Sequence, residues 1–317
     1  MRIVFRAMPK LSLYIGIFTL VAFCNLSVSA DTVQIGTDAS NYVVLFEGGG
    51  TGNHLNITNV TINGNIGVGG SGLVAFSGPG AINGRLDFSA SNSSQFSSTN
   101  GSNVGPSSTN FNVSAVSNAL TAVNSLNTTL GGAAGTSESI SLSGSTTLTI
   151  NENSGMLFTT GGVTYRVFSV TGFNTTNGNT IQIVGDGSGD PVVFNFTSAA
   201  NFNNQVTLNG LSDDQVLWNF VGGSSLSGGP TLQINNNGGN GSATAGAMGI
   251  FLDPNGTVSV THANVFGRVF GGDSHDMQIV SGTTINAPSA VPEPGTLALF
   301  GSGLLGLAGF IRRRITR

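Results

Sequence analysis

Residues 191–220 read PVVFNFTSAANFNNQVTLNGLSDDQVLWNF and carry the clearest structural signal in the chain. Their apolar runs, Val192–Phe196, Val206–Asn209 and Val216–Phe220, are short and alternate toward the pattern of a strand. Asn-Gly, Gly-Gly and Asp-Gly pairs separate runs of this kind and are typical of tight turns. The region between the two chain ends has about 260 residues, which is enough for one all-β domain with a continuous core.

Similar strand-like pieces recur in the second half of the chain. One set is Val206–Asn209, Leu232–Asn235, Val258–Thr261 and Met277–Val280, at spacings of 26, 26 and 19 residues, and another is Val192–Phe196, Val216–Phe220, Met248–Leu252 and Val265–Phe270. Loose repeats of this length predict the stacked coils of a solenoid. The uneven spacing also fits a β-sandwich. We favour the solenoid, because asparagines end the strands and only 8% of the residues are charged.

One segment departs from the strand pattern. Apolar residues recur at spacings of three and four over residues 113–130, and Gly131-Gly132 follows. This spacing predicts an amphipathic helix with a glycine stop and one apolar stripe to bury. The positions in the stripe are Val113, Val116, Leu120, Val123, Leu126 and Leu130.

The charge of the central region excludes one class of partner. Residues 31–290 contain thirteen acidic side chains and three basic ones, Arg85, Arg166 and Arg268, so thirteen minus three gives a net charge near minus ten. A nucleic-acid-binding surface needs basic side chains that displace counterions from phosphates. We therefore expect no nucleic-acid partner.

The N-terminus has the three parts of a secretory signal peptide. Arg2, Arg6 and Lys10 form a basic region, an apolar run covers residues 11–26, and the small residues before Ala30 predict cleavage after it. The only cysteine, Cys24, lies in this segment. A mature chain that begins at Asp31 would have neither disulfides nor a thiolate site.

The C-terminus has a second ordered arrangement. Val291, Pro292, Glu293, Pro294 and Gly295 come first, and residues 296–311 follow without a charge. A basic cluster of Arg312, Arg313, Arg314 and Arg317 closes the chain. The uncharged run predicts a short membrane segment of about 24 Å as a helix. Because basic residues stay on the cytoplasmic side, the cluster predicts a C-terminus inside and a body outside. A plain single-pass anchor is the alternative.

This C-terminal arrangement resembles the PEP-CTERM sorting signal of Gram-negative bacteria that make exopolysaccharide. The resemblance rests on Pro292-Glu293-Pro294, the Gly- and Leu-rich span and the arginines. It implies export across the inner membrane, a transient anchor there, and processing by an exosortase near the Pro-Glu-Pro. It then implies a place at the cell surface or in the extracellular matrix.

The body resembles the DUF3494 ice-binding-like β-solenoids and the related choice-of-anchor A envelope domains. The resemblance implies a mainly β fold, a right-handed parallel β-helix with one long α-helix packed along it. Its domain would cover residues 31–290. The segments that carry the resemblance are Tyr42–Phe46, Ile62–Val68, Gly78–Gly84, Gly189–Phe196, Asn209-Gly210, Val216–Phe220 and Val265–Phe270, together with the predicted helix.

Several polar segments are candidate sites. Ser145–Ile150 is the best candidate for a Thr-rich ice-binding strand, although a single strand is not an array. Asp273–Asp276 combines Asp and His, but without a known ligand spacing we interpret it as a surface loop. The spacing in Asp186–Asp190 suits calcium, but the loop lacks the acidic residues that complete a calcium site. Asp213-Asp214 on a strand would point to opposite faces. We predict no catalytic, cofactor-binding or metal-binding residue.

These observations predict an exported, non-enzymatic surface or matrix protein with a structural or glycan-interaction role. Its expected partners are an exosortase, exopolysaccharide and, before processing, the membrane. The first alternative is an ice-binding protein, which requires a regular outward row of Thr. The second is a polysaccharide-acting β-helix enzyme, which requires carboxylates and an Arg that converge in a groove.

Overall fold

The computed structural model describes residues 31–49, 52–91, 93–99, 103–221, 232–235, 246–272 and 276–288. These residues belong to one compact unit that runs from Ala30 to Ser289. The signal peptide, the sorting motif Val291–Gly295, the uncharged segment 296–311 and the arginine cluster lie outside the described residues.

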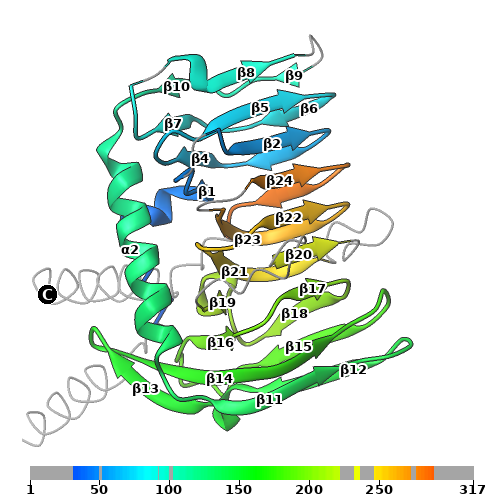
Figure 1. The fold of residues 1–317 in the computed structure, drawn as a ribbon. Helices are drawn as coiled ribbons and strands as arrows, with labels where there is room; N and C mark the ends of the chain where they lie inside the picture. Colours follow the sequence, from blue (N-terminus) through cyan, green and yellow to red (C-terminus); the bar gives the residue numbers. More distant parts are fainter. Residues whose placement is uncertain are drawn as a thin grey trace, which may run out of the picture. The chain divides into compact units, whose positions relative to one another are not determined.

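The unit is a solenoid of stacked, mainly parallel strands with three faces (Figure 1). The helix-covered face consists of β10 (Thr109–Asn110), β7 (Leu86–Phe88), β4 (Asn65–Val68), β1 (Tyr42–Phe46), β23 (Asn264–Gly271), β21 (Ala247–Asp253), β19 (Val216–Phe220), β16 (Val192–Phe196), β14 (Val163–Asn174) and β11 (Thr136–Ser141). The antiparallel hairpin strand β13 (Met156–Thr160) joins it at β14.

The second face, called the seven-stranded face below, consists of β17 (Ala200–Phe202), β20 (Leu232–Asn235), β22 (Val258–Thr261), β24 (Met277–Val280), β2 (His54–Thr58), β5 (Leu73–Ser77) and β8 (Phe96–Ser98). The third face contains β12 (Thr147–Asn151), β15 (Thr180–Val184), β18 (Gln205–Asn209), β25 (Thr284–Asn286), β3 (Thr61–Asn63), β6 (Gly80–Ile82) and β9 (Asn103–Val104). Short 3-10 turns are η1 (Ala39–Asn41), η2 (Ser93–Gln95), η3 (Glu152–Ser154) and η4 (Asp213–Gln215).

The chain does not fill the solenoid from one end to the other. It starts in the middle with β1 and climbs to β10, and α2 (Ser114–Gly131) then returns along the side to β11 (Figure 1). From β11 the coils rise again until the last strands meet the first. The seam between the two halves pairs Val44 with Val269 on the helix-covered face and Leu55 with Met277 on the seven-stranded face.

The repeat sets from the sequence fall on distinct faces. All four members of the second set lie on the helix-covered face, in β16, β19, β21 and β23. In the first set, Leu232–Asn235, Val258–Thr261 and Met277–Val280 lie on the seven-stranded face. The grouping of Val206–Asn209 with them was wrong, because β18 pairs with β15 on the third face. Alternation identifies a strand but not its face.

The predicted helix is present within one residue of its expected bounds. Val116, Val123 and Leu130 are buried against the helix-covered face, and Gly132 follows the last turn. Asn127 is also buried, and its amide donates to Asn219 Oδ1 at 2.7 Å and to the Phe220 carbonyl at 2.9 Å. Asn195 in turn donates to the Leu130 carbonyl at 2.7 Å. These bonds fix the register of the helix on the sheet, because a buried amide needs its partners.

Aromatic side chains stack along the inside of the helix-covered face. The ring centroids of Phe168 and Phe194 are 5.0 Å apart, those of Phe194 and Trp218 are 4.5 Å apart, and those of Trp218 and Phe251 are 6.1 Å apart. The four rings come from adjacent strands in register. Trp218 is fully buried.

Candidate functional site

The seven-stranded face presents two outward rows of side chains. In each strand the alternate apolar residues point into the core, and the residues between them point outward. The first outward row runs through Asn201, Gln233, Ser259, Gln278, Asn56, Ala75 and Ser97. The second outward row runs through Asn235, Thr261, Val280, Thr58 and Ser77.

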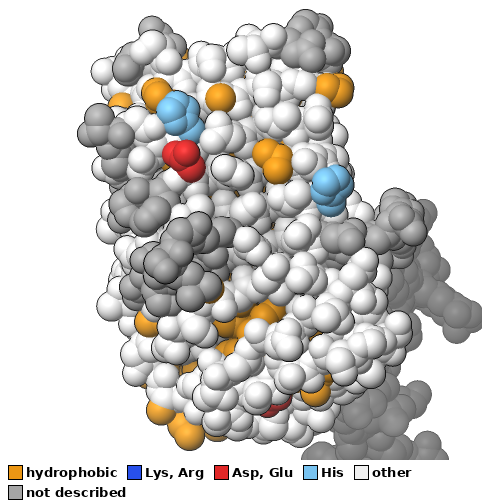
Figure 2. Space-filling model, turned by 45° about the vertical axis from the view of Figure 1, so that its right-hand side comes forward, with side chains coloured by type: hydrophobic (Ala, Val, Ile, Leu, Met, Phe, Trp, Pro, Cys, Tyr) orange, Lys and Arg blue, Asp and Glu red, His pale blue; other side chains and the backbone are white. Residues whose placement is uncertain are grey.

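The two rows form an uncharged array of amides, hydroxyls and small apolar groups. No Asp, Glu, Lys or Arg occurs in the seven strands. Neighbouring strands of a sheet are about 4.8 Å apart, so six intervals between seven strands extend over roughly 29 Å. Figure 2, which turns the right-hand side of Figure 1 forward, shows mostly white surface and no Lys or Arg. The array can therefore donate and accept hydrogen bonds without a strong field.

A hydrogen bond at the margin of this face joins residues from the two halves of the chain. The backbone N–H of His54, the first residue of β2, donates to Asp276 Oδ1 at 2.8 Å. These two residues are 222 positions apart in the sequence, and the sequence alone did not bring them together. Asp276 belongs to the predicted cluster Asp273–Asp276, whose first three residues lie outside the described residues.

The residue that follows the strand has the same left-handed backbone conformation in four of these strands. Asn59, His262 and Ser281 have φ values of 56°, 50° and 60°, and Gly78 has 69°. Each follows directly after a strand of the seven-stranded face. Asn and Gly adopt this left-handed conformation most readily. The same backbone conformation thus recurs at the corner after each of these four strands.

The Thr-rich candidate Ser145–Ile150 lies elsewhere. It forms much of β12, an edge strand of the third face. Thr147 pairs with Thr180 and then with Gln205, and Thr149 pairs with Gln182 and then with Thr207. This part of the third face therefore has no uninterrupted row of Thr across its three strands.

The arginines of the body are each tied to an aspartate. Arg166 Nε donates to Asp190 Oδ2 at 3.0 Å, and its Nη2 lies 3.6 Å from Asp186 Oδ2. Hydrogen bonds from Ser188 lower the pKa of Asp186. In the calcium candidate Asp186–Asp190, the carboxylates thus face an arginine, and the described residues contain no group of three or more His, Cys, Asp or Glu that could hold a metal ion.

Arg268 lines an open pocket of about 260 Å³ together with residues 32–37, Ser40 and Asp214. Its Nε donates to Asp214 Oδ1 at 3.1 Å, and its Nη1 donates to the Ser40 and Tyr42 carbonyls at 2.8 and 2.6 Å. The expectation that Asp213-Asp214 lies on a strand was wrong, because both residues are in the 3-10 turn η4. Asp214 serves as the partner of Arg268.

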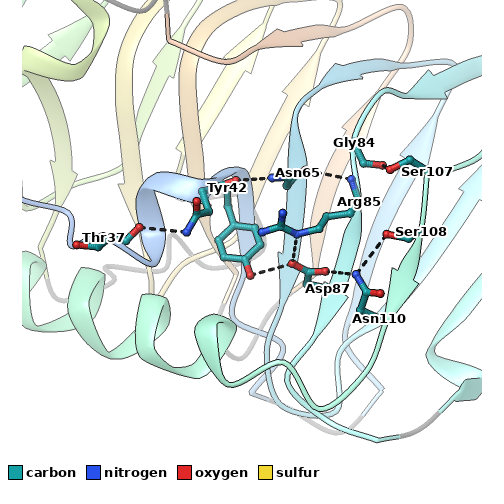
Figure 3. Close-up of polar contacts among 10 residues, drawn as sticks. Thr37, Tyr42, Asn65, Gly84, Arg85, Asp87, Ser107, Ser108 and Asn110 are labelled. Carbon is teal, nitrogen blue, oxygen red and sulfur yellow. Dashed lines mark hydrogen bonds and ion pairs between the residues drawn. The ribbon is translucent and has the colours of Figure 1, made fainter.

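A third polar group joins β1, β7 and β10 (Figure 3). Asp87 accepts hydrogen bonds from Arg85 Nε at 2.6 Å, from the Tyr42 hydroxyl at 3.1 Å and from the Asn110 amide at 2.7 Å. Burial and the neighbouring Asp87 raise the pKa of Tyr42 to about 12. Asp87 is 1% exposed and Tyr42 is fully buried, so this group acts as a clamp between coils.

Comparison with known proteins places this fold in a family. The model of the ice-binding-like adhesive domain matches residues 15–283, which is most of the chain. The chain belongs to this family. A second model, the PEP-CTERM protein-sorting motif, matches residues 290–314. Both matches confirm the resemblances stated from the sequence, and comparison with curated proteins gives no match.

This adhesive-domain protein is similar to several solved structures. An ice-binding protein from the Antarctic ascomycete Antarctomyces psychrotrophicus has 13% identity and a TM-score of 0.46, over 82% of this chain and 100% of that chain. An ice-binding protein from an Antarctic bacterium of the Flavobacteriaceae has 17% identity and a TM-score of 0.47, over 84% of this chain and 49% of that chain. The DUF3494 domain of Shewanella frigidimarina ice-binding protein 1 has 13% identity and a TM-score of 0.40, over 82% of this chain and 99% of that chain.

The sorting motif indicates that the adhesive-domain protein is exported to the cell surface and processed by an exosortase. The residues predicted for this step lie outside the described residues. Among the residues that the structure does describe, no helix is long and apolar enough to cross a membrane.

Proposed function

We propose that this adhesive-domain protein is a non-catalytic adhesin whose seven-stranded face binds neutral polysaccharide of the extracellular matrix. The observation that carries the proposal is the composition of the two outward rows. They repeat amide and hydroxyl groups over seven strands and contain no charged side chain. A sugar chain offers hydroxyl groups that such amides can bind in both directions, because an amide both donates and accepts.

The rest of the molecule supports the neutral character of this ligand. The body carries a net charge near minus ten, so it would repel a polyanionic glycan unless the binding face supplied basic groups. The arginines are engaged elsewhere with Asp87, Asp190 and Asp214. A neutral polysaccharide is not repelled by the negative charge of the body and needs no free arginine for binding.

Several acidic side chains of the body favour a binding protein over an enzyme, because they are engaged within the fold. A polysaccharide-acting β-helix enzyme needs carboxylates and an Arg that converge on an open groove. Here Asp87 and its tyrosine partner are buried inside the fold, and Glu152 is fully buried and accepts hydrogen bonds from the Asp186 N–H and the Ser188 hydroxyl. These acids have structural partners that a substrate would have to displace.

The sorting signal supplies the location for this function. In the proposed sequence of events, a Gram-negative host exports the chain and the residues 296–311 hold it briefly in the inner membrane. An exosortase then cuts near Pro292–Pro294, and the body reaches the exopolysaccharide layer. The match of the PEP-CTERM model to residues 290–314 supports this route.

Retention on the host's own exopolysaccharide, with the processed protein purified from the host, tests the proposal. Asn56→Asp with Gln278→Glu places two charges at the centre of the seven-stranded face. Asn209→Asp with Gln182→Glu makes the same chemical change on the third face. We expect the first pair of substitutions to weaken retention by about tenfold or more, because the hydrogen bonds that the amide N–H groups donate to the sugar are lost. The second pair should leave retention unchanged. Equal retention of both variants and the parent would overturn the proposal.

Ice binding is the second candidate, and one observation favours it. Thr261, Val280, Thr58 and Ser77 are adjacent in the second outward row, so four neighbouring strands present small, mostly hydroxylated side chains. The first outward row beside it contains longer amides at Gln233, Gln278 and Asn56, which interrupt a flat surface. Thermal hysteresis that is present in the parent and absent in Thr58→Gln would establish ice binding. Its absence in the parent leaves the glycan proposal standing.

A further inference from the structure

The first residues after the predicted signal peptide form a segment that is packed from its start. We call residues 31–37 the N-terminal arm. Val33 and Ile35 are 3% and 5% exposed and pack in the same cluster as the buried face of α2. The Val33 N–H donates to the Asp214 carbonyl at 2.9 Å, and the Gln34 N–H donates to the Tyr165 hydroxyl at 3.4 Å. The arm therefore crosses the helix-covered face as part of the core.

Asp31 is held on both sides of its own backbone. Its nitrogen donates to the Gly189 carbonyl at 3.0 Å, and its carbonyl accepts from Gln215 Nε2 at 3.2 Å. Gln215 is 4% exposed and also donates to the Gly189 carbonyl at 3.2 Å, while its Oε1 accepts from the Ser212 N–H. The first residue after the predicted cleavage site is therefore fixed on both sides of its backbone.

We propose that the α-amino group created by cleavage after Ala30 is a structural part of the mature body, which locks the N-terminal arm onto Gly189. Cleavage replaces one amide N–H at Asp31 with an ammonium group that has three donors. A charge-assisted hydrogen bond to the Gly189 carbonyl is stronger than the neutral bond it replaces. Removal of the signal peptide would then stabilise the fold of the body in addition to its role in export.

The charges around Gly189 favour an ammonium group at this position. Asp186 and Asp190 lie on the same loop, and Arg166 is the cation that faces both carboxylates. Asp214, whose carbonyl binds the arm, has its carboxylate paired with Arg268. Two carboxylates that share one guanidinium leave a local excess of negative charge, which an ammonium at Asp31 reduces.

A second consequence concerns the order of events. A peptidase needs its substrate extended on both sides of the cut bond, and a docked arm holds Asp31 and Val33 in hydrogen bonds to Gly189 and Asp214. We therefore expect cleavage to be faster before the arm docks than after it.

The test uses the full chain, expressed in an exporting host and purified after processing, with mass spectrometry to identify the first residue. One variant has a Gln inserted between Ala30 and Asp31, which keeps the small residues before the cut and moves the amino group by one position. Asp31→Asn is the matched control, because it keeps the amino group in place. Hydrogen exchange at the Val33 and Gln34 amides reports docking of the arm.

We expect the parent to begin at Asp31 and the insertion to speed exchange at these amides about tenfold, the difference between a charged and a neutral hydrogen bond. The control should match the parent. Acetylation of the α-amino group in the folded parent tests the same bond without a change of sequence, and should speed exchange to a similar extent. Unchanged exchange in both the inserted and the acetylated chains, or a mature chain that begins elsewhere, would overturn the proposal.

Discussion

We predict that this protein loses stability as the pH rises toward neutrality, because of the buried carboxyl group of Asp253, the last residue of β21. The side chain is fully buried, and neither carboxylate oxygen has a hydrogen-bond partner. Burial raises the pKa of Asp253 from its ordinary value of 3.8 to about 7. The N–H of Gly256 faces the carboxyl group and offsets part of this rise without completing a hydrogen bond. We expect Asp253→Asn to remove the resulting dependence on pH.

The sign and size follow from proton linkage. Between pH 4 and pH 7 the folded protein keeps a proton on Asp253 that the unfolded chain releases, so the free energy of unfolding falls as the pH rises. The difference between 7 and 3.8 is about three pH units, and each is worth about 1.36 kcal/mol. The expected loss from this residue between pH 4 and pH 8 is therefore roughly 4 kcal/mol, and it is constant above pH 8.

Urea denaturation of the purified protein at pH 4, 6 and 8 measures this effect. Asp253→Asn should resemble the parent at pH 4 and be more stable than the parent at pH 8, because the amide cannot ionise. Asn255→Ala, an exposed change in the same turn, is the control for disturbance of the turn and should keep the parent's dependence on pH. The reasoning fails if parent and Asp253→Asn show the same change in stability between pH 4 and pH 8.

Two further predictions concern the helix and the tail. Asn127→Ala leaves the Asn219 side chain without its donor in a buried site, so we expect a loss of about 3 kcal/mol in thermal or urea unfolding, with Asn124→Ala as the comparison on the same helix. Replacement of Pro292, Glu293 and Pro294 by alanine should block processing in the native host, so that the chain keeps the mass of residues 291–317 and stays in the membrane fraction. A normally processed product from that variant would remove the exosortase step.

The sequence predicted the elements that depend on local pattern. The helix is found at Ser114–Gly131 because its apolar residues recur at the period of one face, and Trp218 is buried because it alternates with other core residues. Repeated short strands predicted the solenoid, and the family resemblance implied that its strands are parallel. The grouping of Val206–Asn209 with three strands of the seven-stranded face was wrong, because alternation is the same on every face of the solenoid.

The polar groups were beyond prediction for a different reason. Asp87 meets Tyr42 and Asn110 across 45 and 23 positions, and His54 meets Asp276 across 222. Such pairs are set by the register of stacked coils, which a single residue of slippage would change. The buried state of Asp253 also gave no local signal, because Asp-Pro-Asn-Gly reads as an exposed turn.

The discontinuous path of the chain has a consequence for the binding face. The seam between the two halves runs through the middle of the seven-stranded face, where Gln278 pairs with Asn56 and Val280 with Thr58. The outward rows are therefore complete only when strands from both halves pair. The helix α2 joins these halves, and its buried Asn127 fixes it to Asn219 on the second half. A ligand that spans the seam contacts both halves, so it should stabilise the whole fold and not one half alone. Loosening the helix should in turn weaken binding on a face that the helix never touches.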